Sequence, residues 1–198
     1  MNTSFQKFAG WMAVLAGVSG FLYSVAFIVL QSNLLSALFL MLGGLFSTAA
    51  LTALYQRLRG ADSGFALLGL LLTLSAALGS AIHGGYDLSN TLHPPASLNM
   101  DLPNPIDPRG LLTFGVAGLG LFLLAWLMTR EMRLPRGLAY LGILSALLMI
   151  ILYLGRLIIL QATSIVIIVP ALLEGFVVNP IWYIWLGLTF FRGISPSR

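Results

Sequence analysis

Residues 138–160, LAYLGILSALLMIILYLGRLIIL, contain one charged side chain, Arg156. Crossing a hydrocarbon core about 30 Å thick takes about 20 helical residues, so this stretch predicts a membrane-spanning helix. Similar apolar runs, bounded by charged or turn residues, cover residues 8–30, 34–55, 64–82, 111–128 and 165–191. The sequence therefore predicts an all-α integral membrane bundle of six transmembrane helices.

The composition agrees with this class. Hydrophobic residues make up 59% of the chain and charged residues 8%, whereas a soluble domain has roughly a quarter of its residues charged. A soluble fold cannot hide so much apolar surface, so the lipid bilayer is an expected partner. We expect residues 1–198 to form one domain. The excess of Lys and Arg follows the pattern of cytoplasmic loops, so no nucleic-acid partner is expected.

The cations predict the orientation of the bundle, because Lys and Arg concentrate on the cytoplasmic side. Every second end of the predicted helices carries them: Lys7, Arg57 with Arg59, Arg130 with Arg133 and Arg136, and Arg192 with Arg198. These ends are predicted to be cytoplasmic, as are both termini. On the opposite side, Arg109 is the only cation of the connecting segments.

The connection between the third and fourth predicted helices, about residues 84–109, is a long outer loop. It is polar and rich in proline, and connections of this length in compact domains are usually functional or disordered. We expect it to form an ordered cap over the outer mouth of the bundle, with a short helix near residues 86–92. His83, Tyr86, Asp87 and His93 are its candidate ligand-binding residues.

A divalent-metal site is one hypothesis for His83, Asp87 and His93, since histidine and carboxylate are common metal ligands. It requires the third helix to continue through Gly84 and Gly85. Hydrogen bonding and turn capping explain the same residues without a metal. Haem ligation by the two histidines is disfavoured by their placement at a helix end and in a loop. A retinal Schiff base needs a buried lysine, whereas the only lysine is Lys7. The sequence identifies no cofactor.

Two ionisable residues, Arg156 and Glu174, lie inside predicted membrane helices. A charge at mid-bilayer costs at least about 2.5 kcal/mol, so such residues usually face the bundle and find partners. The fifth and sixth helices are joined by a short loop, and the two side chains could pair with each other. Alternatively, Arg156 extends to the outer headgroups while Glu174 stays protonated and hydrogen-bonded to a neighbouring helix.

The last predicted helix is interrupted around Glu174. Pro170 and Pro180 each remove an amide donor, which predicts a kink, and Gly175 and Asn179 add flexibility and a polar side chain. Broken helices of this kind line binding sites in transporters, although passive bundles contain them too. The following aromatic residues, Trp182, Tyr183 and Trp185, are expected to form an interfacial belt near the cytoplasmic end.

The strings HGGYD (83–87), DPRG (107–110) and NPIWYIWLG (179–187) resemble those of small multi-pass membrane proteins of bacteria. The resemblance implies a location in the bacterial cytoplasmic membrane but supplies no activity. Zinc hydrolases of the ceramidase and haemolysin type use a His-x-x-x-His pair. This chain has Asp87 where the second histidine would fall.

The leading hypothesis is a non-enzymatic membrane protein with an outer-side cavity for a small or lipid-like ligand, used for binding, permeation or sensing. Its predicted site combines His83, Asp87, Arg156 and Glu174. One alternative is an accessory subunit that docks a membrane-protein partner in a larger redox or photosynthetic complex. A second is a metal-dependent lipid hydrolase, for which the sequence offers no nucleophile and base at a diagnostic spacing.

Overall fold

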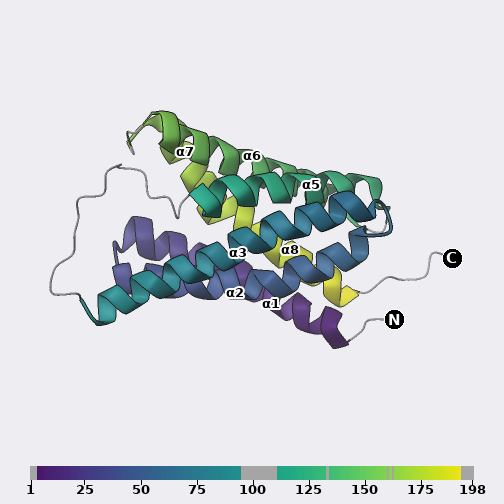
Figure 1. The fold of residues 1–198 in the computed structure, drawn as a ribbon, viewed down its shortest axis with the longest axis horizontal. Helices are drawn as coiled ribbons and strands as arrows, with labels where there is room; N and C mark the ends of the chain where they lie inside the picture. The colour runs from purple at the N-terminus through teal and green to yellow at the C-terminus, as the bar shows by residue number, and fades with distance from the viewer. Residues whose placement is uncertain (1–3, 95–110, 133, 160, 162, 193–198) are drawn as a thin grey trace.

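The computed structural model describes residues 4–94, 111–132, 134–159, 161 and 163–192, and this part of the chain contains helices and no strands (Figure 1). Five helical runs are long and apolar enough to cross a membrane, and Phe114–Arg130 is a shorter apolar helix. In chain order the elements, with η marking π-helical segments, are α1 (Ser4–Ser24), η1 (Val25–Val29), α2 (Asn33–Leu58), α3 (Ser63–Leu92), η2 (Leu111–Val116), α5 (Ala117–Arg130), α6 (Arg136–Ile158), α7 (Ile165–Leu173), η3 (Glu174–Val178) and α8 (Asn179–Arg192).

The helices form a closed bundle. Each span packs against the next one along the chain, and α8 packs against α1. Figure 1 shows the helices running along the long axis, with the start of α1 and the end of α8 at the same end of the molecule. We call this the Arg57 end, because α2 finishes there. The opposite end, where α3 and α6 finish and α7 begins, is the Asp87 end.

Glycines allow neighbouring helices to approach closely. A methyl group added at Gly17 would lie 2.8 Å from the carbonyl oxygen of Pro180, and one at Gly187 would lie 2.6 Å from that of Gly10. Both contacts join α1 to α8. Because lipid tails are as apolar as the helices, membrane bundles depend on such close van der Waals packing, which small residues permit.

Helix α3 is longer than the sequence analysis predicted. Residues 84–92, which were assigned to the outer loop with a short helix near residues 86–92, are helical and continue α3 to Leu92. The reason is packing, because a methyl group at Gly84 would collide with the Met41 amide and lie 2.6 Å from the Ala37 carbonyl oxygen. Contact with α2 therefore outweighs the weak helix propensity of the Gly84–Gly85 pair. The rest of the predicted loop, residues 95–110, lies outside the described residues, as does the predicted cap.

The apolar core is concentrated towards the Arg57 end. Trp182 and Phe190 of α8 are completely buried there, so the predicted interfacial position of Trp182 is wrong. The guanidinium of Arg57 lies 4.8 Å from the centre of the Phe190 ring, a cation–π contact. The large side chains buried most deeply are Leu54, Leu58, Leu124, Leu127, Met128, Leu138, Trp182, Leu186 and Phe190.

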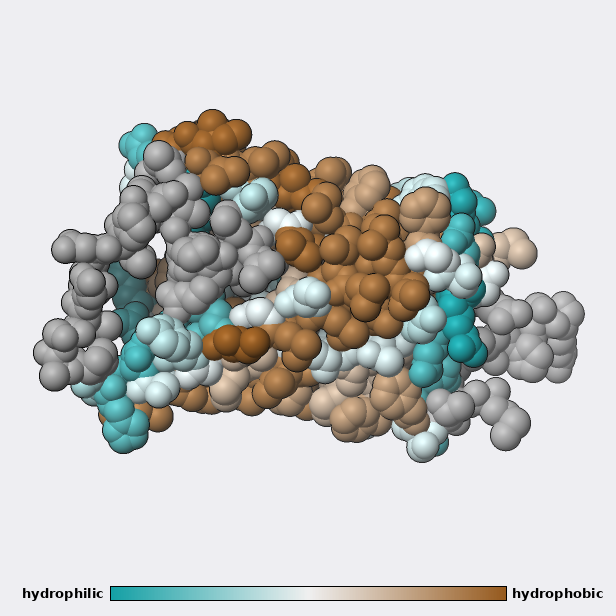
Figure 2. All heavy atoms as spheres, viewed as in Figure 1, coloured by the Kyte–Doolittle hydropathy of each residue, from teal (hydrophilic) through white to brown (hydrophobic). Residues whose placement is uncertain are grey.

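The surface of the bundle has an apolar band between two polar ends (Figure 2). Many exposed residues of the helices are large and hydrophobic, among them Trp11, Leu71, Ile82 and Ile151. Such a surface is stable in contact with lipid and would associate in water. The chain therefore has the build of a membrane-embedded protein.

Candidate functional site

The carboxyl group of Glu174 is buried in the middle of the bundle. Glu174 is the first residue of η3 and lies about 14 Å along the helical span from Ile165. It is 5% exposed. The hydroxyl of Ser145, on α6, is completely buried and donates a hydrogen bond of 2.6 Å to Oε1 of Glu174. The glutamate is therefore linked to a neighbouring helix by a short, buried hydrogen bond.

The second carboxyl oxygen of Glu174 has no such bond. The Asn179 side chain lies close to the carboxyl group, but buried Oε2 has no partner within hydrogen-bonding geometry among the described residues. An unsatisfied buried polar atom is costly, and an unpaired carboxylate is more costly still. This oxygen therefore needs a proton or a hydrogen-bond donor.

The backbone around Glu174 is π-helical. The Asn179 amide donates to the Glu174 carbonyl, five residues earlier, and Pro180 then has no amide proton to donate. π-helical turns inside α-helices often occur at functional sites. The sequence predicted an interruption here, and the structure has a π-helical segment within one continuous helical run, Ile165–Arg192.

Helix α1 lies directly against this segment. A methyl group at Gly175 would collide with the buried Ser24 hydroxyl, and one at Gly20 would lie 3.1 Å from the Asn179 side-chain oxygen. The Ser24 hydroxyl donates to the Gly20 carbonyl at 3.2 Å. Small residues thus bring hydroxyl and amide groups of α1 and α8 to the level of Glu174.

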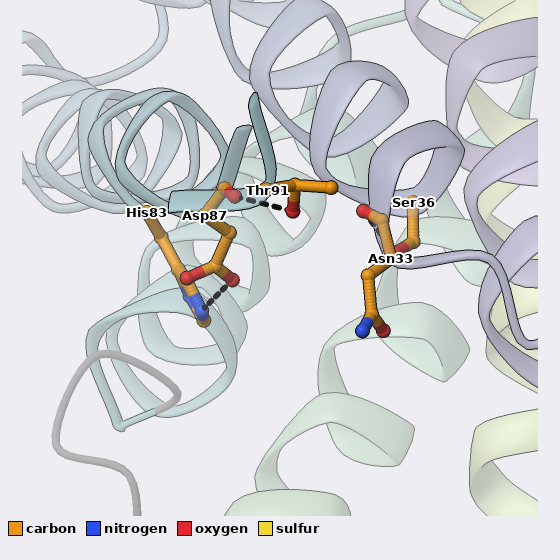
Figure 3. Close-up of polar contacts among 5 residues, drawn as sticks. All are labelled: Asn33, Ser36, His83, Asp87 and Thr91. Carbon is orange, nitrogen blue, oxygen red and sulfur yellow. Dashed lines mark hydrogen bonds and ion pairs between the residues drawn. The ribbon is translucent and has the colours of Figure 1, made fainter. Parts of the chain in front are cut away.

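A second group of polar side chains lies at the Asp87 end. Nε2 of His83 is 3.1 Å from Oδ2 of Asp87, one helical turn further along α3. The Thr91 hydroxyl donates to the Asp87 carbonyl at 2.8 Å. Figure 3 shows these residues beside the start of α2, where the Ser36 hydroxyl donates to the Asn33 carbonyl at 3.1 Å. Since α3 continues through Gly84 and Gly85, His83 and Asp87 share one helical face, as the metal hypothesis required.

Tyr23, near the end of α1, lies close to the second group. Its hydroxyl is within electrostatic reach of both Arg156 and Asp87. Arg156 itself is exposed near the end of α6, and no ion pair joins it to Glu174 in the described part of the chain. Of the two arrangements open at the sequence level, the structure has Glu174 hydrogen-bonded to a neighbouring helix and Arg156 at the surface.

Two further predicted site residues, Tyr86 and His93, are exposed on α3. Tyr86 is 57% exposed and follows Ile82 on the outward face of α3. His93 is exposed at the C-terminal cap of α3, two to three turns beyond His83. Within the described residues no three His, Asp or Glu side chains come together as metal ligands, and the predicted His83, Asp87 and His93 set is not assembled.

Comparison with protein-family models, with curated proteins and with solved structures finds no match to this chain. The assignment of function therefore depends on the geometry of the chain itself.

The sequence analysis missed three residues of the site: Tyr23, Ser24 and Ser145. Each is a hydroxyl-bearing residue inside a long apolar run, and such residues usually hydrogen-bond to their own helix backbone, as Ser24 does. Ser145 differs because its partner is on another helix. A buried serine can be assigned to a distant carboxyl group only when the packing of the two helices is known.

Proposed function

We propose that the chain is a non-enzymatic membrane protein that binds a small or lipid-like ligand in the half of the bundle nearest the Asp87 end. The observation that carries the proposal is the buried carboxyl group of Glu174, whose Oε2 lacks a hydrogen-bond partner among the described residues. Ionisable residues inside membrane bundles usually serve binding or transport, because their burial is costly.

Polar groups extend from Glu174 towards the Asp87 end. Tyr23 precedes Ser24, which packs against Gly175 beside Glu174, and its hydroxyl is within electrostatic reach of Asp87 and Arg156. His83 adds a second polar side chain at that end through its contact with Asp87. A polar ligand moving inward from the Asp87 end would find hydrogen-bonding groups along this route.

The opposite half of the bundle favours binding or sensing over permeation. Between Glu174 and the Arg57 end, the interior is filled by close-packed apolar side chains, including Trp182, Leu186, Phe190 and Met128. A permeation path would need polar groups or water through this region, because an ion or polar solute is not stable among apolar side chains. The apolar core therefore closes the proposed site towards the Arg57 end.

A lipid-like ligand has a side route as well. Helix α7 packs on α6 and has no comparable contact with α1 or η1 in the described structure. Ile165, at the start of α7, is 74% exposed, and Val29, at the end of η1, is 64% exposed. An acyl chain could lie between α7 and η1, in continuity with the surrounding lipid.

The proposal includes the orientation of the chain. Six membrane spans with both termini in the cytoplasm would place the Arg57 end inside a bacterial cell and the Asp87 end outside. The distribution of Lys and Arg supports this, since Lys7, Arg57, Arg130 and Arg192 are all at helix ends on one side of the bundle.

The proposal is tested by extracting the protein with its native lipids and identifying bound small molecules by native mass spectrometry. The wild-type chain is expected to carry a ligand that the Arg156→Ala/Glu174→Ala double variant has lost. Asp62→Asn is the matched control, because it removes a carboxylate at the other end while asparagine can still cap α3. Retention of the same ligand by the double variant would contradict the proposal.

The exposed surface of α7 also supports a second candidate, an accessory subunit whose partner covers that surface. The same native mass measurement separates the two candidates. A chain that leaves the membrane as a monomer, without other polypeptides, would contradict the subunit function and leave ligand binding as the explanation.

A further inference from the structure

We infer that the ligand consists of a protonated amine attached to an apolar body of a few carbon atoms, and that the amine pairs with Glu174. The inference rests on the proposed function, since it names the chemical class of ligand for the same site. It starts from Oε2 of Glu174, which is buried, has no hydrogen-bond partner within the described residues, and belongs to a side chain that is 95% removed from solvent.

The charge of the site favours a cation over an anion. Among the described residues Glu174 is the buried acidic one, and Arg156 does not pair with it there. A ligand carboxylate or phosphate beside Glu174 would add a second negative charge in an environment of low polarity, where like charges repel strongly. A ligand cation there neutralises the carboxylate.

The number of acidic groups favours a single positive charge. Divalent metal ions in proteins are bound by several ligands, and the described residues contain no cluster of three His, Cys, Asp or Glu side chains. One carboxyl group, with the Ser145 hydroxyl already donating to its Oε1, matches a monovalent partner. A protonated amine also supplies the N–H donor that Oε2 lacks.

The residues on the α7 side favour an organic cation. The buried residues of α7, between the Asp87 end and Glu174, are Ile167 and Pro170. Ile167 contacts α6, where its Cγ1 would lie 3.2 Å from a methyl group at Gly155. An alkyl group beside these aliphatic side chains would gain burial energy that a hydrated inorganic ion would not.

The approach to Glu174 does not exclude a cation. The Asp87 end holds an acidic as well as a basic side chain, because the Tyr23 hydroxyl is within electrostatic reach of both Asp87 and Arg156. The far side of Glu174 is blocked by the apolar core. A monovalent amine would therefore reach the carboxylate from the Asp87 end.

The test uses the full chain in phosphatidylcholine nanodiscs, with n-butylamine and n-butanol as probes of equal length. Butylamine is protonated at neutral pH, as a lysine side chain is. It is expected to raise the unfolding temperature of the wild-type chain and of Asp62→Asn, and to bind Glu174→Gln about tenfold more weakly or not at all. Butanol is expected to act equally on all three chains.

Glutamine can still accept the Ser145 hydrogen bond, so Glu174→Gln is expected to fold, which its helical circular dichroism would confirm. Should it not fold, Glu174→Asp replaces it, because aspartate keeps the charge one methylene further from the amine and is expected to bind butylamine with reduced affinity.

Equal butylamine affinities for wild type and variant overturn the inference. If butanol raises the unfolding temperature of the wild type as much as butylamine does, the site binds a ligand but does not select an amine, and the inference is wrong. The proposed function itself fails only in the co-purification experiment.

Discussion

Oγ of Ser145 lies 2.6 Å from Oε1 of Glu174, and this hydrogen bond joins α6 to the π-helical segment η3. It holds one carboxyl oxygen in place deep in the bundle and leaves Oε2 without a hydrogen-bond partner in the described part of the structure. A purely structural glutamate would be expected to have both oxygens satisfied, because buried polar groups nearly always are. The half-satisfied carboxyl group is therefore the feature on which the functional interpretation depends.

Replacing Ser145 with alanine is expected to lower the free energy of unfolding by about 1 kcal/mol, since hydrogen bonds between membrane helices contribute roughly this amount. Reversible unfolding in mixed micelles measures the change. Ser80→Ala is the control, because the Ser80 hydroxyl donates to the Ala76 carbonyl of its own helix. Its loss is expected to change stability less.

A double-mutant cycle checks that the effect comes from the bond itself. In a Glu174→Leu background the Ser145 hydroxyl has no carboxyl partner, so Ser145→Ala should no longer destabilise the chain by the same amount. The two substitutions are expected to be non-additive by about 0.5 kcal/mol or more. Strict additivity would mean that the serine and the glutamate do not interact.

The adjacent glycines of α3 offer a matched pair of substitutions. Gly84→Ala is expected to destabilise the chain by about 1–3 kcal/mol, because its methyl group would collide with the α2 backbone at Met41. Gly85→Ala should be neutral or slightly stabilising, since its methyl group would meet only Sδ of Met41, at 3.7 Å, and alanine favours the helix. Equal effects in the same unfolding assay would show that α3 does not pack through this turn.

The contact between Gly175 and Ser24 predicts a substitution and its rescue. Gly175→Ala is expected to cost about 1–3 kcal/mol in unfolding free energy, because the new methyl group would collide with the Ser24 hydroxyl. Ser24→Gly in the same chain should recover much of that loss by removing the obstructing side chain. Gly60→Ala, where nothing lies within 4 Å, is the control. If Ser24→Gly does not restore stability, α1 does not pack against η3 through this contact.

The orientation is testable because the chain contains no cysteine. Single-cysteine variants at Asp62 and His93 report the Arg57 end and the Asp87 end respectively, since Asp62 is half-buried at the start of α3 and His93 is exposed at its end. A membrane-impermeant maleimide added to intact cells is expected to label His93→Cys and not Asp62→Cys. The reverse pattern would place the proposed site on the cytoplasmic side.

The sequence was sufficient for the helices and insufficient for their contacts. Apolar runs bounded by charges predicted most helix ends to within a few residues, because the thickness of a membrane sets a minimum length for each span. The exception was α3, where the contact of Gly84 with α2 overrides a local preference that would end the helix. Trp182 was misplaced for a similar reason, because aromatic residues near a helix end also pack into cores.

The site was predictable only in part. A glutamate inside an apolar run is itself a signal, and Glu174 and Asn179 were identified from it. Its partner was not, because Ser145 is separated from Glu174 by 29 residues and many serines lie in similar surroundings. Whether Arg156 reaches Glu174 depends on the depth and rotation of two helices, and hydropathy alone defines neither.

The most direct test of the account is the accessibility of a cysteine at position 174 from each side of the membrane. Glu174→Cys in proteoliposomes of known orientation is treated with a small cationic methanethiosulfonate reagent, added inside or outside, and modification is read by mass spectrometry. The account predicts that the reagent modifies the cysteine at position 174 only from the side of the Asp87 end. Because this variant lacks the carboxylate, butylamine is expected to slow the modification no more than butanol does. Modification from the side of the Arg57 end, through the apolar core, would contradict it.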